Sequence, residues 1–309
     1  MTDISIAIHG GAGTILKSSM TPKKEAAYKN ALQNALKAGY QLLEQGATAL
    51  DTVEIAVSEL EDCHLFNAGK GSLFTADETH EMDASIMDGS TLNAGAVSLI
   101  TGIKNPVQLS RLVMEKSGYV FLSGKGAEDF ARLLKCEFRD ADYFYDEFRH
   151  QQWSEVRGTD KFQLDHSDSK EQKFGTVGAV ALDKYGNIAA ATSTGGMTNK
   201  NFGRVGDSAI IGAGNYANNK TCAVSCTGSG EFFIRGVVAY DVSCLIEYKG
   251  LSLKEACREV IQHRLTKIGG DGGLIAVDTK GNIELEFNTP GMYRGKKSSN
   301  GKYEVAIYR

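Results

Sequence analysis

Two runs of small and β-branched residues, Val177–Leu182 and Ile188–Thr194, stand out in the hydrophobic pattern of the chain. Residues 183–187 between them are typical of a turn, so the two runs predict a β-hairpin. Neither run has a polar face, which is typical of strands buried on both sides. Residues 165–173, just before the hairpin, include no apolar side chain. The pattern therefore predicts a polar segment that leads into a core strand at Thr176, where a threonine is also an ordinary strand residue.

The rest of the chain alternates between helical and extended patterns. Thr21 is a good capping residue and Pro22 suits a first turn, so a helix should begin there and end at Gly46. Further helices are predicted over residues 49–61, 106–116, 126–135, 231–248 and 252–265. Strands are predicted over residues 4–9, 81–88, 92–100, 223–227, 273–278, 283–287 and 303–308, with a turn at 215–219. This mixture predicts sheets covered by helices in one continuous α/β architecture.

Composition excludes several classes of protein. The 309 residues are 42% hydrophobic and 23% charged, which is typical of a globular chain. A net charge of −4 indicates no basic surface for nucleic acid, and no apolar run reaches the roughly 18 residues of a membrane span. The first residues lack the pattern of a secretory signal, so we expect reduced thiols and a cytoplasmic location. The six cysteines, whose spacing fits no zinc site, are Cys63, Cys136, Cys222, Cys226, Cys244 and Cys257.

A glycine-rich stretch, residues 10–13, follows the first predicted strand. A dinucleotide-binding turn would need a third glycine at position 16, where the chain has Leu16. We therefore expect these glycines to let the backbone approach another element closely. His9 directly precedes them, and we expect its ring to be structural and to anchor the glycine turn.

Two polar groups could carry chemistry. Arg204 and Asp207 lie three residues apart in a glycine-containing loop, where they form either an ordinary surface ion pair or a site for a zwitterion. In the second case the guanidinium takes an α-carboxylate and the carboxylate takes an α-ammonium group. Thr227 and Gly228, at the end of a predicted strand, offer a hydroxyl and a backbone N–H that can stabilise an oxyanion.

A set of motifs then identifies a resemblance. The segments GTVGAVALD, TSTGG, GRVGDS, GAGNYA and TGSGE occur in this order, with HGGAG and FNAGKGSLFTADETHEMDASIMDG before them and FNTPGMYRG near the end. Together they resemble the plant-type L-asparaginase / isoaspartyl peptidase family over nearly the whole chain. The resemblance implies a single domain of residues 1–309 with the N-terminal-nucleophile (Ntn) hydrolase fold, a four-layer αββα sandwich.

The resemblance also implies that the chain is an inactive precursor that cuts itself between Gly175 and Thr176. Residues 1–175 would form an α-subunit that ends in a polar linker, about residues 154–175. Residues 176–309 would form the β-subunit. Thr176 would then be the nucleophile, and its new α-amine would be the base.

The remaining site positions come from the same resemblance. Thr194 would support the hydroxyl of the nucleophile, and Asn67 would lie close to it. Arg204 and Asp207 would hold the α-carboxylate and the α-amine of the substrate. The oxyanion hole, which also contacts the substrate, would be Thr227 and Gly228. A sodium ion would be held by backbone carbonyl groups of Leu60, Glu61, Cys63, Phe66, Ala68 and Lys70.

The implied function is hydrolysis of L-asparagine to L-aspartate and ammonia and cleavage of β-aspartyl dipeptides, without a cofactor in the bond changes. The small-molecule substrate would be processed by a dimer of αβ units, with no nucleic-acid or membrane partner. Three alternatives remain open at this point: a glycosylasparaginase-like hydrolase, a protein-cutting threonine aspartase, and a non-catalytic amino-acid-binding homologue.

Overall fold

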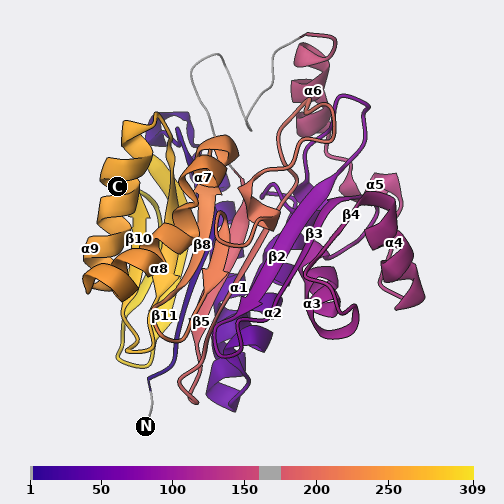
Figure 1. The fold of residues 1–309 in the computed structure, drawn as a ribbon. Coiled ribbons are helices and arrows are strands. Elements are labelled where there is room, and N and C mark those ends of the chain that lie inside the picture. The colour runs from indigo at the N-terminus through magenta and orange to yellow at the C-terminus, as the bar shows by residue number, and fades with distance from the viewer. Residues whose placement is uncertain (1–2, 160–174) are drawn as a thin grey trace.

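The computed structural model describes residues 3–159 and 175–309. Two β-sheets pack face to face between two layers of helices, as Figure 1 shows. Within the described residues the larger sheet has eight strands in the order β12-β11-β1-β5-β6-β2-β3-β4. The smaller sheet has four strands in the order β10-β9-β8-β7. The predicted α/β sandwich of four layers is confirmed.

The elements have the following bounds. The strands of the larger sheet are β1 (Ser5–Gly13), β2 (Met82–Asp88), β3 (Ala94–Ile100), β4 (Phe121–Ser123), β5 (Val177–Leu182), β6 (Ile188–Thr194), β11 (Gly291–Ser298) and β12 (Tyr303–Tyr308). The strands of the smaller sheet are β7 (Asn215–Ala217), β8 (Ala223–Gly228), β9 (Gly272–Val277) and β10 (Ile283–Phe287). The α-helices are α1 (Pro22–Gln45), α2 (Ala49–Glu61), α3 (Pro106–Lys116), α4 (Gly124–Leu133), α5 (Ala141–Phe144), α6 (Glu147–Val156), α7 (Gly230–Gly236), α8 (Val238–Lys249) and α9 (Leu253–Arg258). Short helical turns are η1 (Lys17–Ser19), η2 (Gly69–Gly71), η3 (Asp207–Ala209) and the π-helix η4 (Glu259–Leu265).

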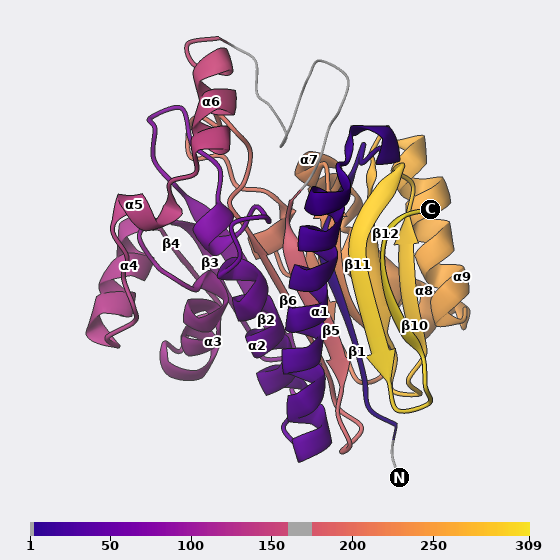
Figure 2. The ribbon, with the colours of Figure 1, turned by 180° about the vertical axis from the view of Figure 1, so that it is seen from behind.

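The two longest predicted helices have the predicted bounds. The Thr21 hydroxyl accepts the Lys24 N–H at the start of α1, and Gly46 ends α1 in the left-handed conformation. Thr48 and Asp51 form a reciprocal capping box at the start of α2. Both helices lie across the outer face of the larger sheet (Figure 2).

The central strands of the larger sheet are buried on both faces. On one side, residues of β1, β5 and β6 pack against α1 and α2 in one hydrophobic cluster. On the other side, small and β-branched residues such as Val180 and Ala190 pack against Ile275 and Val277 of the smaller sheet. The outer face of the smaller sheet is covered by α8 and α9. Complete burial of each aliphatic side chain contributes about 1.5–3 kcal/mol, so the hairpin β5–β6 is held from both sides.

Several local predictions were wrong. The glycine-rich stretch does not form a turn: it continues β1 to Gly13, with an irregularity of the pairing with β11 between His9 and Ala12. The predicted turn at 215–219 begins as β7, which pairs with β8. The sequence pattern also missed β11, because its alternation includes Arg294 and two lysines that gave no apolar signal.

Some helical segments also differ from the predictions. The Asp146 side chain accepts the Arg149 N–H and starts α6, so residues 154–156 belong to this helix and not to the predicted linker. The rest of that linker, up to residue 174, lies largely outside the described residues. The helix predicted over 231–248 is interrupted at Val237, which has a φ of 47°.

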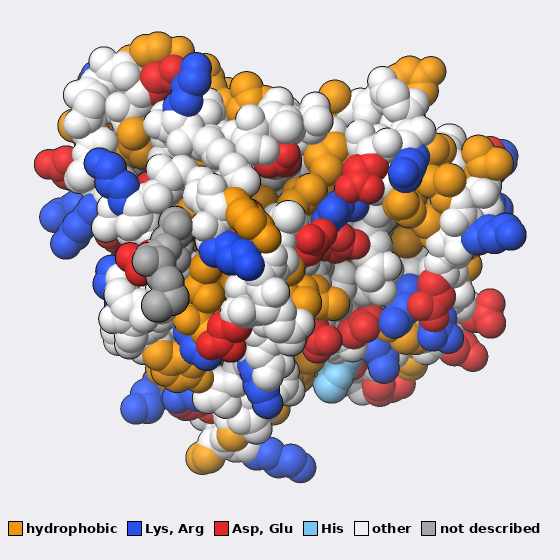
Figure 3. Space-filling view, turned by 90° about the horizontal axis from the view of Figure 1, so that it is seen from below, with side chains coloured by type: hydrophobic (Ala, Val, Ile, Leu, Met, Phe, Trp, Pro, Cys, Tyr) orange, Lys and Arg blue, Asp and Glu red, His pale blue; other side chains and the backbone are white. Residues whose placement is uncertain are grey.

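The described part of the chain contains no helix with both the length and the apolar character that crossing a membrane requires. On the face seen in Figure 3, basic and acidic side chains are interspersed. This face offers no extended basic surface of the kind that binds nucleic acid.

Candidate active site

Thr176 and Thr194 lie side by side where β5 begins and β6 ends. The strands pair Val177 with Ser193, and this register brings the two threonines together. The Thr176 hydroxyl donates to Thr194 Oγ1 over 3.2 Å, and the Gly196 N–H donates to the same oxygen over 3.1 Å. Thr176 is 8% exposed, so the hydroxyl is held in a nearly closed environment.

The carbonyl group of Gly175 faces the loop that carries Asn67. Its oxygen accepts the backbone N–H of Asn67 over 3.0 Å. The Asn67 side chain is itself fixed, since Nδ2 donates to the Gly196 carbonyl over 2.7 Å and Oδ1 accepts the Leu73 N–H over 3.2 Å. The donor that polarises the Gly175 carbonyl is therefore held on a loop with its own hydrogen bonds.

His9 does not anchor a glycine turn, because its ring contacts Thr176 and Ser225 instead. Nδ1 is 3.0 Å from the Thr176 carbonyl oxygen, and Nε2 is 2.9 Å from the Ser225 hydroxyl on β8. Complete burial lowers the pKa of His9 to about 3, although its bond to the Thr176 carbonyl acts in the opposite direction. Gly178 pairs with His9 across β1 and β5, and a glycine at that position is the one residue that could have indicated the contact.

Thr227 and Gly228 end β8 on the side that faces β1. The Thr227 oxygen accepts the Ala12 N–H over 3.3 Å, which leaves its hydroxyl proton available for donation. Gly228 has a φ of 156°, and a side chain there would lie 2.4 Å from the carbonyl oxygen of Asp271. Only glycine therefore lets the chain turn away from β8 at this point.

Arg204 and Asp207 converge on the glycine at position 230. A Cβ atom at Gly230 would lie 2.9 Å from Arg204 Nη2 and 3.0 Å from Asp207 Oδ1. Asp207 is 4% exposed, and its Oδ2 accepts no hydrogen bond from the described residues. Burial raises the pKa of Asp207 to about 7, while the charge of Arg204 acts in the opposite direction. One oxygen of this buried carboxyl group therefore has no hydrogen-bond donor among the described residues.

The simple ion pair between Arg204 and Asp207 is not found among the described residues. The Arg204 guanidinium instead donates to both carboxylate oxygens of Glu231, over 2.9 and 3.0 Å. Arg204 also lines a hollow of about 350 Å³ together with Met197, Lys200, Asn201, Phe202 and Glu231. The fork geometry seen toward Glu231 is the geometry with which an arginine takes any carboxylate.

A buried charged group that the sequence did not indicate lies beside this loop. The Lys200 side chain is 2% exposed, pairs with Glu81 over 3.3 Å and donates to the Arg204 carbonyl over 3.4 Å. Asp83 on β2 lies opposite Thr194, and burial raises its pKa. The loop that carries Arg204 therefore has buried charged groups next to it.

The six residues predicted to hold sodium extend from the last turn of α2, through the connection, into η2. Here the chain folds back until a Cβ at Gly69 would lie 2.5 Å from the Glu61 carbonyl oxygen. Backbone carbonyl oxygens are ligands that hard cations accept, so the residue set is compatible with the ion. Across the described residues, no group of three or more His, Cys, Asp or Glu residues could hold a metal ion.

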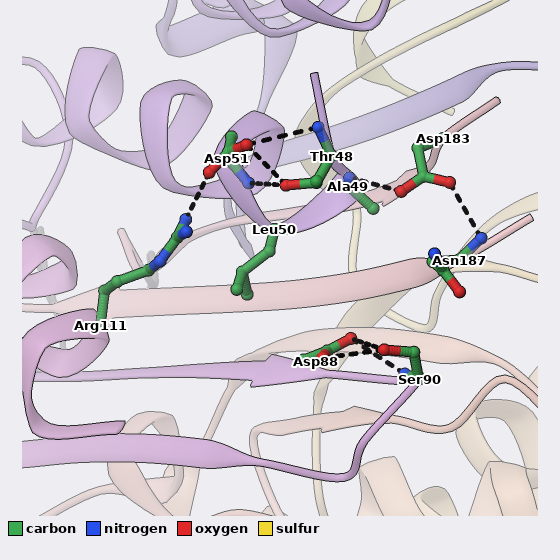
Figure 4. Close-up of a pocket in the computed structure, with 9 residues that line it drawn as sticks. All are labelled: Thr48, Ala49, Leu50, Asp51, Asp88, Ser90, Arg111, Asp183 and Asn187. Atoms are coloured by element: carbon green, nitrogen blue, oxygen red, sulfur yellow. Dashed lines mark hydrogen bonds and ion pairs between the residues drawn. The ribbon is translucent and has the colours of Figure 1, made fainter. Parts of the chain in front are cut away.

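A second hollow, of about 200 Å³, lies at the opposite end of β5 (Figure 4). Its acidic groups are occupied: Asp183 accepts the Ala49 N–H, Asp51 caps α2 and pairs with Arg111, and Asp88 binds Ser90. These contacts cap and join elements of the fold, and they leave no group aimed at a ligand.

Known proteins similar to this chain agree with the motifs. The family model described as "Asparaginase" matches residues 2–307. The isoaspartyl peptidase of Escherichia coli (strain K12) is 52% identical over 307 residues, which cover 98% of this chain and 96% of that protein. A putative isoaspartyl peptidase/L-asparaginase of Dictyostelium discoideum is 45% identical, with 98% of each chain covered. The plant-type L-asparaginase of Thermococcus kodakarensis is 43% identical, with 93% of this chain and 94% of that protein covered.

Proposed function

The chain belongs to the asparaginase family, and from this premise we propose that it is a self-processing threonine amidohydrolase. It hydrolyses L-asparagine to L-aspartate and ammonia, and it cleaves β-aspartyl dipeptides. The names of its relatives contain these two activities, isoaspartyl peptidase and L-asparaginase.

One observation carries the proposal: the Thr176 hydroxyl is bonded to Thr194 at 3.2 Å while the Gly175 carbonyl is held by the Asn67 N–H at 3.0 Å. In self-cleavage the Thr176 oxygen attacks the Gly175 carbonyl carbon. The C–N bond breaks, its nitrogen takes the hydroxyl proton, and an ester links the two residues. Water hydrolyses that ester, which leaves a carboxylate on Gly175 and a free amine and hydroxyl on Thr176.

The new α-amine makes the threonine a usable nucleophile. Its ordinary pKa is about 7.7–8.0, so the neutral amine can accept the hydroxyl proton near pH 7. The Thr176 oxygen attacks the side-chain amide carbon of the substrate, and Thr227 and Gly228 donate to the oxygen that becomes negative. The amine returns the proton to the departing ammonia or amino acid. Water then breaks the acyl ester, and aspartate leaves.

Substrate recognition follows from the two charged side chains. The free oxygen of Asp207 takes the α-ammonium group, and the fork of Arg204 takes the α-carboxylate. Both ends of the aspartyl unit are thereby fixed, and the side-chain amide is left to face the nucleophile. A β-aspartyl dipeptide presents the same two ends, which explains why both substrate types fit.

Three further properties belong to the proposal. Backbone carbonyl groups between Leu60 and Lys70 hold a sodium ion, which would stiffen the loop that carries Asn67. The protein acts as a dimer of αβ units. It works in the cytoplasm, where its six cysteines, all free thiols in the structure, remain reduced.

Maturation tests the proposal directly. We expect the purified parent chain to give two bands on a denaturing gel and a new N-terminus at Thr176, while Thr176→Ala gives a single full-length band. The parent should release ammonia from L-asparagine and leucine from β-aspartyl-leucine, and Thr176→Ala should release neither. A new terminus at another residue would contradict the assignment.

The same measurements separate the alternatives. An intact parent chain that binds aspartate without hydrolysis would indicate a non-catalytic binding homologue. A cleaved chain that hydrolyses glycosylated asparagine faster than either proposed substrate would indicate a glycosylasparaginase.

A further inference from the structure

A continuous chain of buried hydrogen bonds runs from the nucleophile into the second sheet. The Thr176 carbonyl is 3.0 Å from His9 Nδ1, and His9 Nε2 is 2.9 Å from the Ser225 hydroxyl. Ser225 is 2.7 Å from the Thr192 hydroxyl, which in turn donates to the Gly214 carbonyl over 3.2 Å. The His9, Ser225 and Thr192 side chains are wholly buried.

The chemistry of these groups fixes the direction of the chain. A carbonyl oxygen can only accept, so Nδ1 of His9 must carry the proton that reaches Thr176. Burial keeps the ring neutral, so Nε2 is an acceptor and must receive the Ser225 proton. Ser225 has then used its only proton, so the Thr192 hydroxyl shares its single proton between the Ser225 oxygen and the Gly214 carbonyl. The ring is therefore locked in one tautomer by its partner on the opposite sheet.

The glycine at position 178 makes this contact possible. Gly178 lies opposite His9 in the pairing of β1 with β5. A Cβ atom there would lie 2.0 Å from Ser225 Oγ and 2.4 Å from His9 Nε2. Any side chain at position 178 would overlap with these two atoms and prevent the hydrogen bond between His9 and Ser225. This close approach requires the glycine in the GTVG segment.

We propose that His9 is a positioning residue that orients Thr176 through its carbonyl group, an inference that rests on the proposed function. Self-cleavage removes the chain on the amine side of Thr176. From then on its backbone is held only from the Val177 side, and the carbonyl bond to His9 restricts rotation about the Cα–C bond. That rotation sets where the hydroxyl and the new amine lie relative to Thr194 and Thr227.

The inference predicts an effect on the rate of the chemical step and not on substrate affinity. The groups that bind the two ends of the substrate, Arg204 and Asp207, lie outside the chain of hydrogen bonds. Loss of the hydrogen bond from His9 to the Thr176 carbonyl should therefore lower kcat and leave KM close to the parental value.

Two substitutions of the same histidine distinguish positioning from a merely structural role. In His9→Asn the amide nitrogen replaces Nδ1 and can still donate to Thr176, but it leaves the larger cavity. In His9→Gln the amide group replaces Nε2, fills more space and reaches Ser225, but it loses the bond to Thr176. We expect His9→Gln to lose about tenfold or more in kcat, and His9→Asn to lose clearly less, although it is the less stable variant.

Serine substitutions provide a matched control. Ser225→Ala removes the group that locks the tautomer, so kcat should fall. Ser243→Ala removes a hydroxyl of an equally buried pair, since Ser243 and Thr221 also lie 2.7 Å apart. That pair lies away from Thr176, so kcat should keep its parental value.

The experiment measures kcat and KM with L-asparagine and, separately, the rate of self-cleavage of freshly made precursor. Parental kcat in His9→Gln, or an equal loss in both histidine variants, would overturn the inference. The self-cleavage rate, which depends on the same carbonyl, needs no substrate. The self-cleavage rates of the parent and the variants could follow the predicted order while the parent hydrolyses neither substrate. In that case the positioning role stands and the proposed function fails.

Discussion

At the scale of single residues, the unmet hydrogen bond of Asp207 is the most informative feature. Buried polar atoms nearly always have a partner, because burying one without a partner costs about 1–3 kcal/mol. Asp207 Oδ2 has none among the described residues, and a Cβ atom at position 214 would lie only 2.9 Å from it, so the glycine there lets the backbone pass close to the carboxyl group. An incoming ammonium group would supply the missing donor and the missing charge. The unpaired oxygen adds nothing to the stability of the fold, which favours the proposed role of Asp207 in binding a cationic group.

Replacing either charged residue should weaken substrate use more than self-cleavage. Arg204→Ala and Asp207→Ala each remove a charge-assisted hydrogen bond worth about 1.5–3 kcal/mol, so kcat/KM should fall about 10- to 150-fold. Self-cleavage should continue, because within the described residues neither side chain makes a hydrogen bond to Gly175 or Thr176. Steady-state kinetics and a gel time course measure the two effects. Parental kcat/KM in both variants would remove these residues from the substrate site.

The pH profile should report two groups. The α-amine of Thr176 must be neutral to act as base, so kcat should rise through one ionisation near neutrality and then level off. The pKa of Asp207 is raised to about 7 in the free protein, and its protonated form cannot pair with an ammonium group. As pH falls below about 7, kcat/KM should therefore fall more steeply than kcat, because bound substrate favours the carboxylate.

Measuring both parameters from pH 5 to pH 9 checks this expectation. In His9→Asn the ascending limb of kcat should remain, since the ring is a neutral donor and not the base. Loss of that limb in a variant that still cleaves itself would make His9 the base and would contradict the role of the α-amine.

At the scale of elements, the sequence predicted what depends on local periodicity. The hairpin β5–β6 and the helices α1 and α2 have the expected bounds, because their caps and apolar patterns are local. The irregularity in β1 depends on its pairing with β11, a segment far away in the sequence. The contact of His9 with Ser225 depends on the position of the second sheet. No local pattern contains either. Family motifs marked Arg204 and Asp207, but only the folded chain shows that Glu231 pairs with the arginine.

The junction of α7 and α8 is strained at a single residue. Val237 has a φ of 47°, a conformation that costs a β-branched residue roughly 1–2 kcal/mol. Its side chain is 45% exposed, so Val237→Gly loses little packing. We expect the variant to raise the melting temperature by about 1–3 °C, after allowing for the greater freedom of glycine in the unfolded chain.

A glycine placed in the regular part of α8 gives the matched control for that measurement. Glu247→Gly, at an exposed position of the helix, should lower the melting temperature, because glycine disfavours a helix interior by about 1 kcal/mol. If both variants lower it equally, the left-handed residue carries no strain.

At the scale of the whole molecule, the proposed cleavage leaves the fold joined. Strands β1, β2 and β3 precede Thr176, whereas β5, β6, β11 and β12 follow it. Within the larger sheet, β1 lies between β11 and β5, and β6 pairs with β2. The two products therefore share one sheet and one core, so they should separate only in denaturant. Apart from β11, local sequence patterns predicted these strands but not their interleaved order, because strand order depends on contacts between distant segments.

The same burial that builds this core should make the protein sensitive to acid. The pKa of His80 is lowered from 6.5 to about 4 and that of His9 to about 3, mainly by burial. Below pH 6.5 the unfolded chain binds protons that the folded chain does not, so stability is complete above that pH and is lost as the pH falls toward 4. For His80 alone the loss amounts to roughly 3 kcal/mol at pH 4.

His80→Asn, which keeps a donor toward the Ser72 carbonyl, should be less stable than the parent at pH 7 and should lose less stability on acidification. Thermal unfolding from pH 7 to pH 4 measures this, with the exposed His263→Asn as the control that should follow the parent. Parallel curves for the parent and His80→Asn would show that this histidine does not set the acid limit.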